Sequence, residues 1–159
     1  ITANLEFVRN ATKAWMPLGQ DVVIIGGELV GIELAEFLHE RGRTVTVIEP
    51  APRLGKGLLL VRRMRILAEL KEHGVALHGG AQDIAIEPDA VRFTDAAGAV
   101  QQVKADHVIV AMGASGDTAL ADRLRGEGFT VESVGDCNGV GYIEGAIRGG
   151  AEAAARLLA

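Results

Sequence analysis

The chain has 159 residues, of which 48% are hydrophobic and 23% are charged, and its formal net charge is −5. This composition is typical of a globular domain with one core, and the acidic charge argues against a nucleic-acid partner, which needs a basic patch. The single cysteine, Cys137, excludes an internal disulfide, a C-x-x-C redox pair and a cysteine cage for a metal or iron–sulfur cluster.

The sequence also bears on location. No apolar run approaches the roughly 20 residues that span a bilayer, and no signal peptide is visible, so we expect a cytoplasmic protein without a membrane partner. The four histidines show no metal-ligand spacing. Because the chain starts with Ile1 rather than methionine, we expect a fragment of a longer protein.

The first part of the chain alternates strands and helices. Residues 1–20 are expected to form a lead-in from an upstream region, with a short helical pattern that ends at turn residues around Pro17. Continuous apolar runs then predict strands covered on both faces, and apolar residues at helical spacing predict the helices between them. The expected strands cover 22–25, 44–48 and 75–77, and the expected helices cover 30–41 and 58–73.

The pattern then changes to strands alone. Apolar residues alternate with polar ones through Ile84–Ile86, Val91–Phe93 and Val100–Val103, with turn residues between them, which predicts an antiparallel meander. The remaining elements expected are a buried strand over 107–111, a short helix over 120–124, a strand and turn over 129–139, and a helix over 142–158. The fold class is therefore α/β: a Rossmann-like parallel sheet flanked by helices, with a three-stranded meander on one side.

The turn between the first strand and the first helix resembles the dinucleotide fingerprint G-x-G-x-x-G. In that fingerprint the first glycine allows a tight bend, the second lets the backbone approach a pyrophosphate, and the third lets helix and strand pack closely. The helix N-terminus then offers N–H groups and partial positive charge to the anion. The turn here reads Gly26, Gly27, Glu28, Leu29, Val30 and Gly31.

An acid at the end of the second strand indicates the type of coenzyme. Glu49 lies 18 residues after Gly31, close to the spacing of about 20 expected for a carboxylate that binds the ribose hydroxyls. A carboxylate there repels a 2′-phosphate, which favours NAD(H) over NADP(H). Arg53 is the residue nearby that would reverse this preference.

Glu28 stands where the fingerprint has its second glycine. At about 4 Å from a phosphate, like charges cost roughly 1 kcal/mol in water and about 4 kcal/mol at an effective dielectric of 20. Alternatively, a carboxylate at a helix N-terminus is stabilising in itself and leaves the phosphates alone if it points outward. Glu33, on the first turn of the helix, likewise faces either the ligand or only the positive helix end.

Together these segments resemble the C-terminal region of flavoproteins related to 2,4-dienoyl-CoA reductase and trimethylamine dehydrogenase. The resemblance covers about Asp21 to Leu158, and it implies an NAD(P)H-binding domain over 21–116 followed by a returning segment of an FAD-binding domain over 117–159. The stretches that carry it are the meander together with VVIIGGELVGIELAEFLHERGRTVTVIEP, ADHVIVAMG and VGDCNGVGYIEGAIRGGAEAAARL.

The resemblance also assigns roles to residues. It implies that Gly26–Gly31 and Glu49 form the nucleotide site, and that Glu33 lies toward the nicotinamide. Ala111-Met112-Gly113 matches the family's "ATG" turn near the pyridine nucleotide, and Asp136 matches the "GD" aspartate that reaches the flavin. After Cys137 the sequence NGVGY departs from the family pattern, which has a connection containing Pro and Arg there.

In such proteins an FMN barrel with an iron–sulfur cluster and the first half of the FAD domain come before this region. We therefore expect these parts as the partners of the chain, and we expect the chain alone not to hold FAD. The resemblance implies one of two functions. The chain either positions NADH for hydride transfer to FAD in a flavin-dependent oxidoreductase, or it is a non-catalytic ADP-binding or structural module.

Overall fold

The computed structural model describes residues 15–158. The chain divides into two compact units, Ile1–Gly113 and Ala114–Ala159. The helical pattern expected within residues 1–14 lies outside the described residues. From Met16 onward the lead-in belongs to the first unit, because Met16 and Leu18 pack against its core and the Gly19 N–H donates to Nδ1 of His107 at 2.9 Å.

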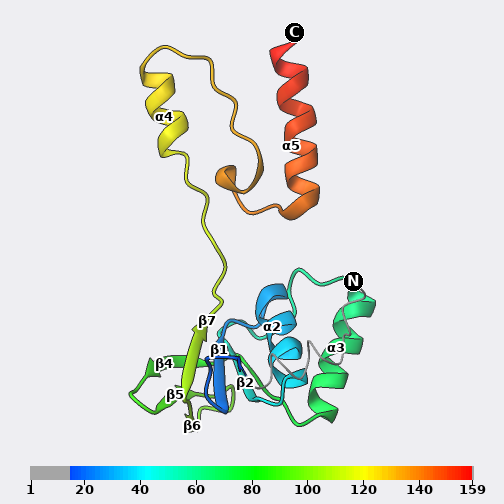
Figure 1. Ribbon diagram of the computed structural model, residues 1–159, viewed down its shortest axis with the longest axis vertical. Helices are drawn as coiled ribbons and strands as arrows, with labels where there is room; N and C mark the ends of the chain where they lie inside the picture. Colours follow the sequence, from blue (N-terminus) through cyan, green and yellow to red (C-terminus); the bar gives the residue numbers. More distant parts are fainter. Residues whose placement is uncertain (1–14, 159) are drawn as a thin grey trace. The chain divides into compact units, whose positions relative to one another are not determined.

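The centre of the first unit is a four-stranded parallel sheet in the order β3-β2-β1-β7. Figure 1 labels its strands β1, β2 and β7. Helices α2 and α3 connect the first three of these strands in chain order, as the alternating pattern predicts. The elements are β1 (Asp21–Ile25), α2 (Leu29–Glu40), β2 (Thr44–Glu49), α3 (Leu60–Glu72), β3 (Ala76–Gly79) and β7 (His107–Val110).

The two central strands, β1 and β2, are covered on both faces, which explains why they read as continuous apolar runs. The strand expected to be buried over 107–111 is different: β7 has no buried residue, because it lies at the edge of the sheet with only β1 beside it among the described strands. Val22 and Ile24 of β1 belong to a core cluster with α2 and α3. Val23 and Ile25 point to the opposite face, where they pack in a second cluster with Phe93. The alternation along one strand therefore assigns successive side chains to two separate cores.

An antiparallel sheet in the order β4-β5-β6 packs against the second cluster. Its strands are β4 (Gln82–Ile86), β5 (Ala90–Thr94) and β6 (Val100–Lys104). Val91 and Phe93 of the middle strand are fully buried, whereas Arg92 between them is exposed. The turn between β5 and β6 is held by Asp95, whose Oδ1 accepts hydrogen bonds from the N–H groups of residues 97 and 99. The α/β fold with a three-stranded meander is thus confirmed.

The second unit contains α4 (Ala119–Gly126), a short 3₁₀ helix (Gly135–Asn138) and α5 (Tyr142–Leu157). The strand expected around residues 129–134 is wrong, because no described strand pairs with it. Side chains hold this segment instead: Arg125 donates to the Val131 carbonyl at 3.0 Å, and Arg156 pairs with Glu132 at 2.8 Å. A β-branched run forms a strand only where another strand lies beside it to pair its backbone groups.

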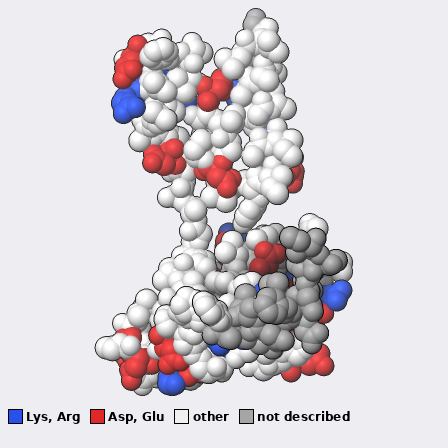
Figure 2. All heavy atoms as spheres, in the orientation of Figure 1, with Lys and Arg blue, Asp and Glu red and all other residues white. Residues whose placement is uncertain are grey.

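Charged side chains are spread over the surface. On the face in Figure 2, acidic side chains outnumber basic ones, in keeping with the net charge of −5. None of the helices in the described part of the chain is long and apolar enough to cross a membrane.

Candidate functional site

The candidate site lies at the carboxyl ends of β1 and β7. These strands are parallel neighbours, whereas β2 and β3 continue the sheet on the other side of β1. In open α/β sheets, the crevice outside the carboxyl ends at such a reversal of strand order is where ligands bind. The turn after β1 and the segment after β7 therefore meet at the position that this fold class uses for ligands.

Gly26 joins these two segments. Its φ of +114° is in the region that favours glycine, and a Cβ there would collide with the backbone carbonyl of Ala111. The Ala111 N–H donates to the carbonyl of Ile25 at 2.7 Å. The first glycine of the fingerprint is therefore required both by its conformation and by the neighbouring strand.

The other two glycines of the turn are also sterically constrained. A Cβ on Gly31 would collide with the carbonyl oxygen of Gly26, so the start of α2 can cross the end of β1 only with glycine there. A Cβ on Gly27 would lie 3.0 Å from both Glu49 and Leu54. The turn keeps the close backbone packing that a dinucleotide site needs, although Glu28 stands within it.

Glu49 is buried beneath the turn, with 5% of its surface exposed. Its Oε2 accepts a hydrogen bond from the Gly27 N–H at 2.5 Å, and its Oε1 accepts one from the Ala51 N–H at 2.7 Å. The carboxylate thus ties the turn after β1 to the loop after β2. Each oxygen keeps a second lone pair, and the contact of Glu49 with a ribose stays a prediction.

Glu28 points toward the loop after β2. It occupies the N-cap position of α2 but makes no side-chain capping hydrogen bond. Its Oε1 lies 3.1 Å from Nζ of Lys56; the Lys56 side chain is largely exposed, whereas that of Glu28 is half-buried. The carboxylate is therefore partly neutralised by a lysine that the sequence analysis did not single out.

The loop that carries Lys56 lies against the turn. The Gly55 N–H donates to the Gly27 carbonyl at 2.6 Å, and the Leu29 N–H donates to the Lys56 carbonyl at 2.9 Å. This loop lines an open hollow of about 450 Å³. The basic side chains that line it are Arg53, Lys56 and Arg63.

Sequence reasoning identified Arg53 here but missed Lys56, and it interpreted Arg63, in the basic run from Arg62 to Arg65, as part of a solvated helix face. A signal for Lys56 was present, since it stands between two glycines seven residues after Glu49. Arg63 donates from Nε to the Leu54 carbonyl at 2.7 Å, so it holds the shape of the loop. The sequence places Arg63 on a predicted helix, and that position alone does not indicate a hydrogen bond to the preceding loop.

The remaining predicted residues fall into two groups. Leu29, Val30 and Glu33 lie on the first turns of α2, and Glu33 is exposed. Met112 and Gly113 are exposed beyond β7, next to the turn. Asp136 belongs to the second unit, where its Oδ1 accepts a hydrogen bond from the Gly141 N–H at 3.0 Å just before α5. The first unit thus contains all of the predicted residues except Asp136.

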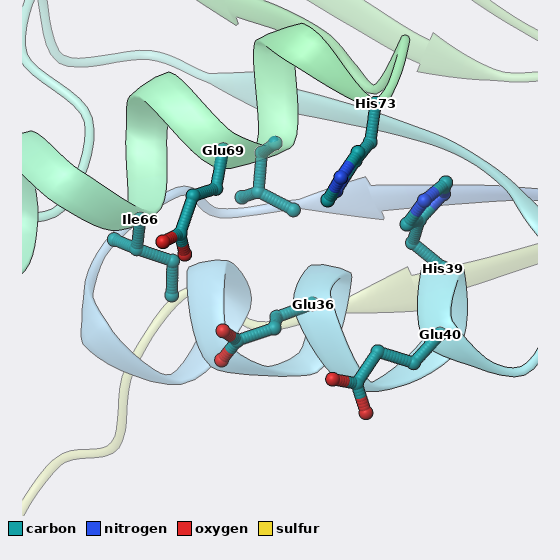
Figure 3. A pocket seen from close by; sticks show the side chains of 7 residues that line it. Glu36, His39, Glu40, Ile66, Glu69 and His73 are labelled. Carbon is teal, nitrogen blue, oxygen red and sulfur yellow. The ribbon is translucent and has the colours of Figure 1, made fainter.

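A second hollow, of about 100 Å³, lies between α2 and α3 (Figure 3). The rings of His39 and His73 stack there with centroids 5.3 Å apart, a pair that the scattered sequence positions did not suggest. Its carboxylates are engaged by arginines: Arg62 binds Glu36 at 2.8 Å, and a hydrogen bond from Arg65 lowers the pKa of Glu69. No cluster suited to a metal ion occurs among the residues that the structure describes.

Comparison with known proteins shows that the chain is similar to part of several reductases and oxidases. The chain is 35% identical over 123 residues to the bilirubin reductase of Mediterraneibacter gnavus, covering 77% of this chain and 19% of that protein. It is 29% identical over 145 residues to the NADH oxidase of Thermoanaerobacter brockii, covering 91% and 22%. The chain therefore spans about a fifth of the length of these relatives.

A solved structure gives the same result. A 2-naphthoyl-CoA reductase complex superposes with a TM-score of 0.75 at 30% identity, over 84% of this chain and 20% of that one. The family model for pyridine nucleotide-disulphide oxidoreductases matches residues 2–137, which is most of the chain. The chain therefore belongs to the pyridine nucleotide-disulphide oxidoreductase family.

Proposed function

We propose that the chain binds a pyridine nucleotide, most favourably NADH, and positions it for hydride transfer to FAD in a flavin-dependent oxidoreductase similar to 2,4-dienoyl-CoA reductase. The observation that carries this proposal is the turn at the carboxyl ends of β1 and β7. Side chains at Gly26 and Gly31 would collide with backbone oxygens there, so the turn keeps the tight bend and the close helix–strand packing that the first and third glycines of the fingerprint provide.

The proposed nucleotide would lie along the carboxyl ends of the parallel strands, between the turn after β1 and the segment after β7. The turn and the N-terminus of α2 would face the pyrophosphate, and Glu49 would accept a hydrogen bond from the adenosine ribose. Glu33, Met112 and Gly113 would shape the nicotinamide end. The nicotinamide and flavin supply the hydride chemistry when bound, and the residues of this chain hold and orient them.

The proposal extends to partners outside the chain. Asp136 and the N-terminus of α5 would face FAD, and the rest of the protein would supply the first half of the FAD domain, an FMN barrel and an iron–sulfur cluster. Exposed apolar side chains on α5 support a packing partner for the second unit, since Ile143 is 80% exposed and Ile147 is 69% exposed. Surface of this kind is typical of a docking face.

A second candidate function is a non-catalytic ADP-binding or structural module. Glu28 favours it, because a carboxylate in the pyrophosphate turn repels phosphate by roughly 1 to 4 kcal/mol at about 4 Å. The Lys56 carbonyl also occupies the Leu29 N–H, one of the orphan donors at the start of α2. Both features weaken nucleotide binding without disturbing the fold.

Calorimetric titration of the chain with NADH, NADPH and ADP tests the first proposal. We expect micromolar binding of NADH, tighter than that of NADPH, and loss of binding in Gly31→Ala. Gly126→Ala is the matched control, since a Cβ at Gly126 has no neighbour within 4 Å. Because a Cβ on Gly31 would collide with the Gly26 carbonyl, circular dichroism is recorded for both variants, and loss of binding supports the proposal only if Gly31→Ala is folded. ADP binding as tight as NADH binding would favour the second candidate, and no binding of any of the three would contradict nucleotide binding.

A further inference from the structure

We propose that Lys56 is a coenzyme-binding residue that neutralises Glu28 and binds the pyrophosphate together with the turn. This inference rests on the proposed function, because it concerns the same nucleotide site. It assigns a role to the loop after β2 and explains how a carboxylate can stand in a phosphate-binding turn.

The position of Lys56 is set by the backbone on both sides of it. Gly55 and Gly57 have φ values of +72° and +90°, in the region that favours glycine. The Gly55 N–H and the Lys56 carbonyl both bond to the turn, to the Gly27 carbonyl and the Leu29 N–H respectively. The loop therefore brings the Lys56 main chain directly against the start of α2.

The side chain of Lys56 has the reach and freedom that the role requires. Its ammonium lies 3.1 Å from Oε1 of Glu28, and the Lys56 side chain as a whole is 78% exposed. An ammonium has three donors, so it can hold one carboxylate oxygen and still donate to a phosphate oxygen. The flexible four-carbon stem lets the charge follow an arriving anion without movement of the backbone.

Charge balance shows why Lys56 matters for affinity. Alone, Glu28 at about 4 Å from a phosphate would weaken binding between about fivefold and about a thousandfold, depending on the effective dielectric. Lys56 places a positive charge in contact with that carboxylate, and the pair carries no net charge. A diphosphate that enters the turn therefore meets the neutral Glu28–Lys56 pair and the positive end of α2. Without Lys56 it would meet the unpaired carboxylate of Glu28.

The alternatives make different predictions for the same substitutions. If Lys56 binds phosphate, its loss exposes the ligand to Glu28 and affinity falls. If the loop only blocks the turn, loss of the Glu28–Lys56 ion pair loosens the loop and affinity rises. If the ion pair is only a surface contact, affinity does not change, because exposed ion pairs contribute little.

The experiment is a double-mutant cycle measured by calorimetric titration with NADH and with ADP, at low and at raised salt. The four chains are the native one, Lys56→Met, Glu28→Gln and the double variant. Lys71→Met is the matched control, because Lys71 is an exposed lysine in the last turn of α3. It changes the net charge equally at a distance from the turn.

We expect Lys56→Met to weaken binding of both ligands by about tenfold or more at low salt, and by less at raised salt as the charges are screened. In the Glu28→Gln background the same substitution should cost at most about threefold. Lys71→Met should bind as the native chain does. This non-additivity is the signature of two coupled residues, because Lys56 acts on the bound phosphate mainly by offsetting the charge of Glu28.

Unchanged or tighter binding by Lys56→Met would overturn the inference, and nucleotide binding by the native chain would leave the proposed function standing. Equal losses in both backgrounds would also overturn it, because Lys56 would then act independently of Glu28. Absence of binding in all four folded chains would overturn the inference and the proposed function together.

Discussion

Replacing Glu49 with glutamine changes one atom of a side chain that is 5% exposed and accepts two backbone hydrogen bonds, from the N–H groups of Gly27 and Ala51. Glutamine keeps the shape but has one acceptor oxygen, so its amide NH₂ must face one of these N–H donors. Hydrogen bonds to charged groups contribute about 1.5–3 kcal/mol each, and a buried donor left unsatisfied adds a similar cost. We therefore expect Glu49→Gln to lower the free energy of unfolding by about 2–4 kcal/mol.

Urea unfolding followed by circular dichroism measures this effect. The expected result is a lower midpoint with an unchanged m-value, since the amount of surface exposed on unfolding stays the same. Glu72→Gln is the control, because Glu72 is an exposed glutamate at the end of α3 and should change stability by under about 0.5 kcal/mol. A change in Glu49→Gln as small as that of the control would refute the conclusion that this carboxylate holds the turn.

Two further predictions concern stability. Asp106 accepts a hydrogen bond from the Asp21 N–H at 2.9 Å, and this bond, with the charge of Lys104, lowers the pKa of its carboxyl below the ordinary 3.8. Its stabilisation is present above that value and is lost as the pH falls through the folded pKa, so Asp106→Asn should flatten the acid side of the stability profile in urea unfolding. Phe93, with no exposed surface, joins the meander to the parallel sheet, and Phe93→Ala should cost about 3–5 kcal/mol; an unchanged unfolding midpoint would contradict that packing.

Much of the fold could be predicted because its signals are local. Each signal depends on a few neighbouring residues. The apolar run predicted β1, the glycine at position 26 predicted the tight turn, and the helical spacing predicted α2; the structure contains all three. The alternation around Phe93 likewise predicted the meander. The segment around residues 129–134 has the same β-branched character, yet it forms no strand, because a strand also needs a neighbour that the local sequence does not specify.

The candidate site divides in the same way. The sequence by itself determined the glycine turn, the acid at the end of β2 and the segment after β7, because steric demands and strand order recur wherever this fold is built. Only the tertiary structure decided that Glu49 bonds to Gly27, that Glu28 pairs with Lys56 and that His39 stacks on His73. Such contacts depend on the position of side-chain atoms from separate elements to within an ångström, and no pattern within one element encodes that distance.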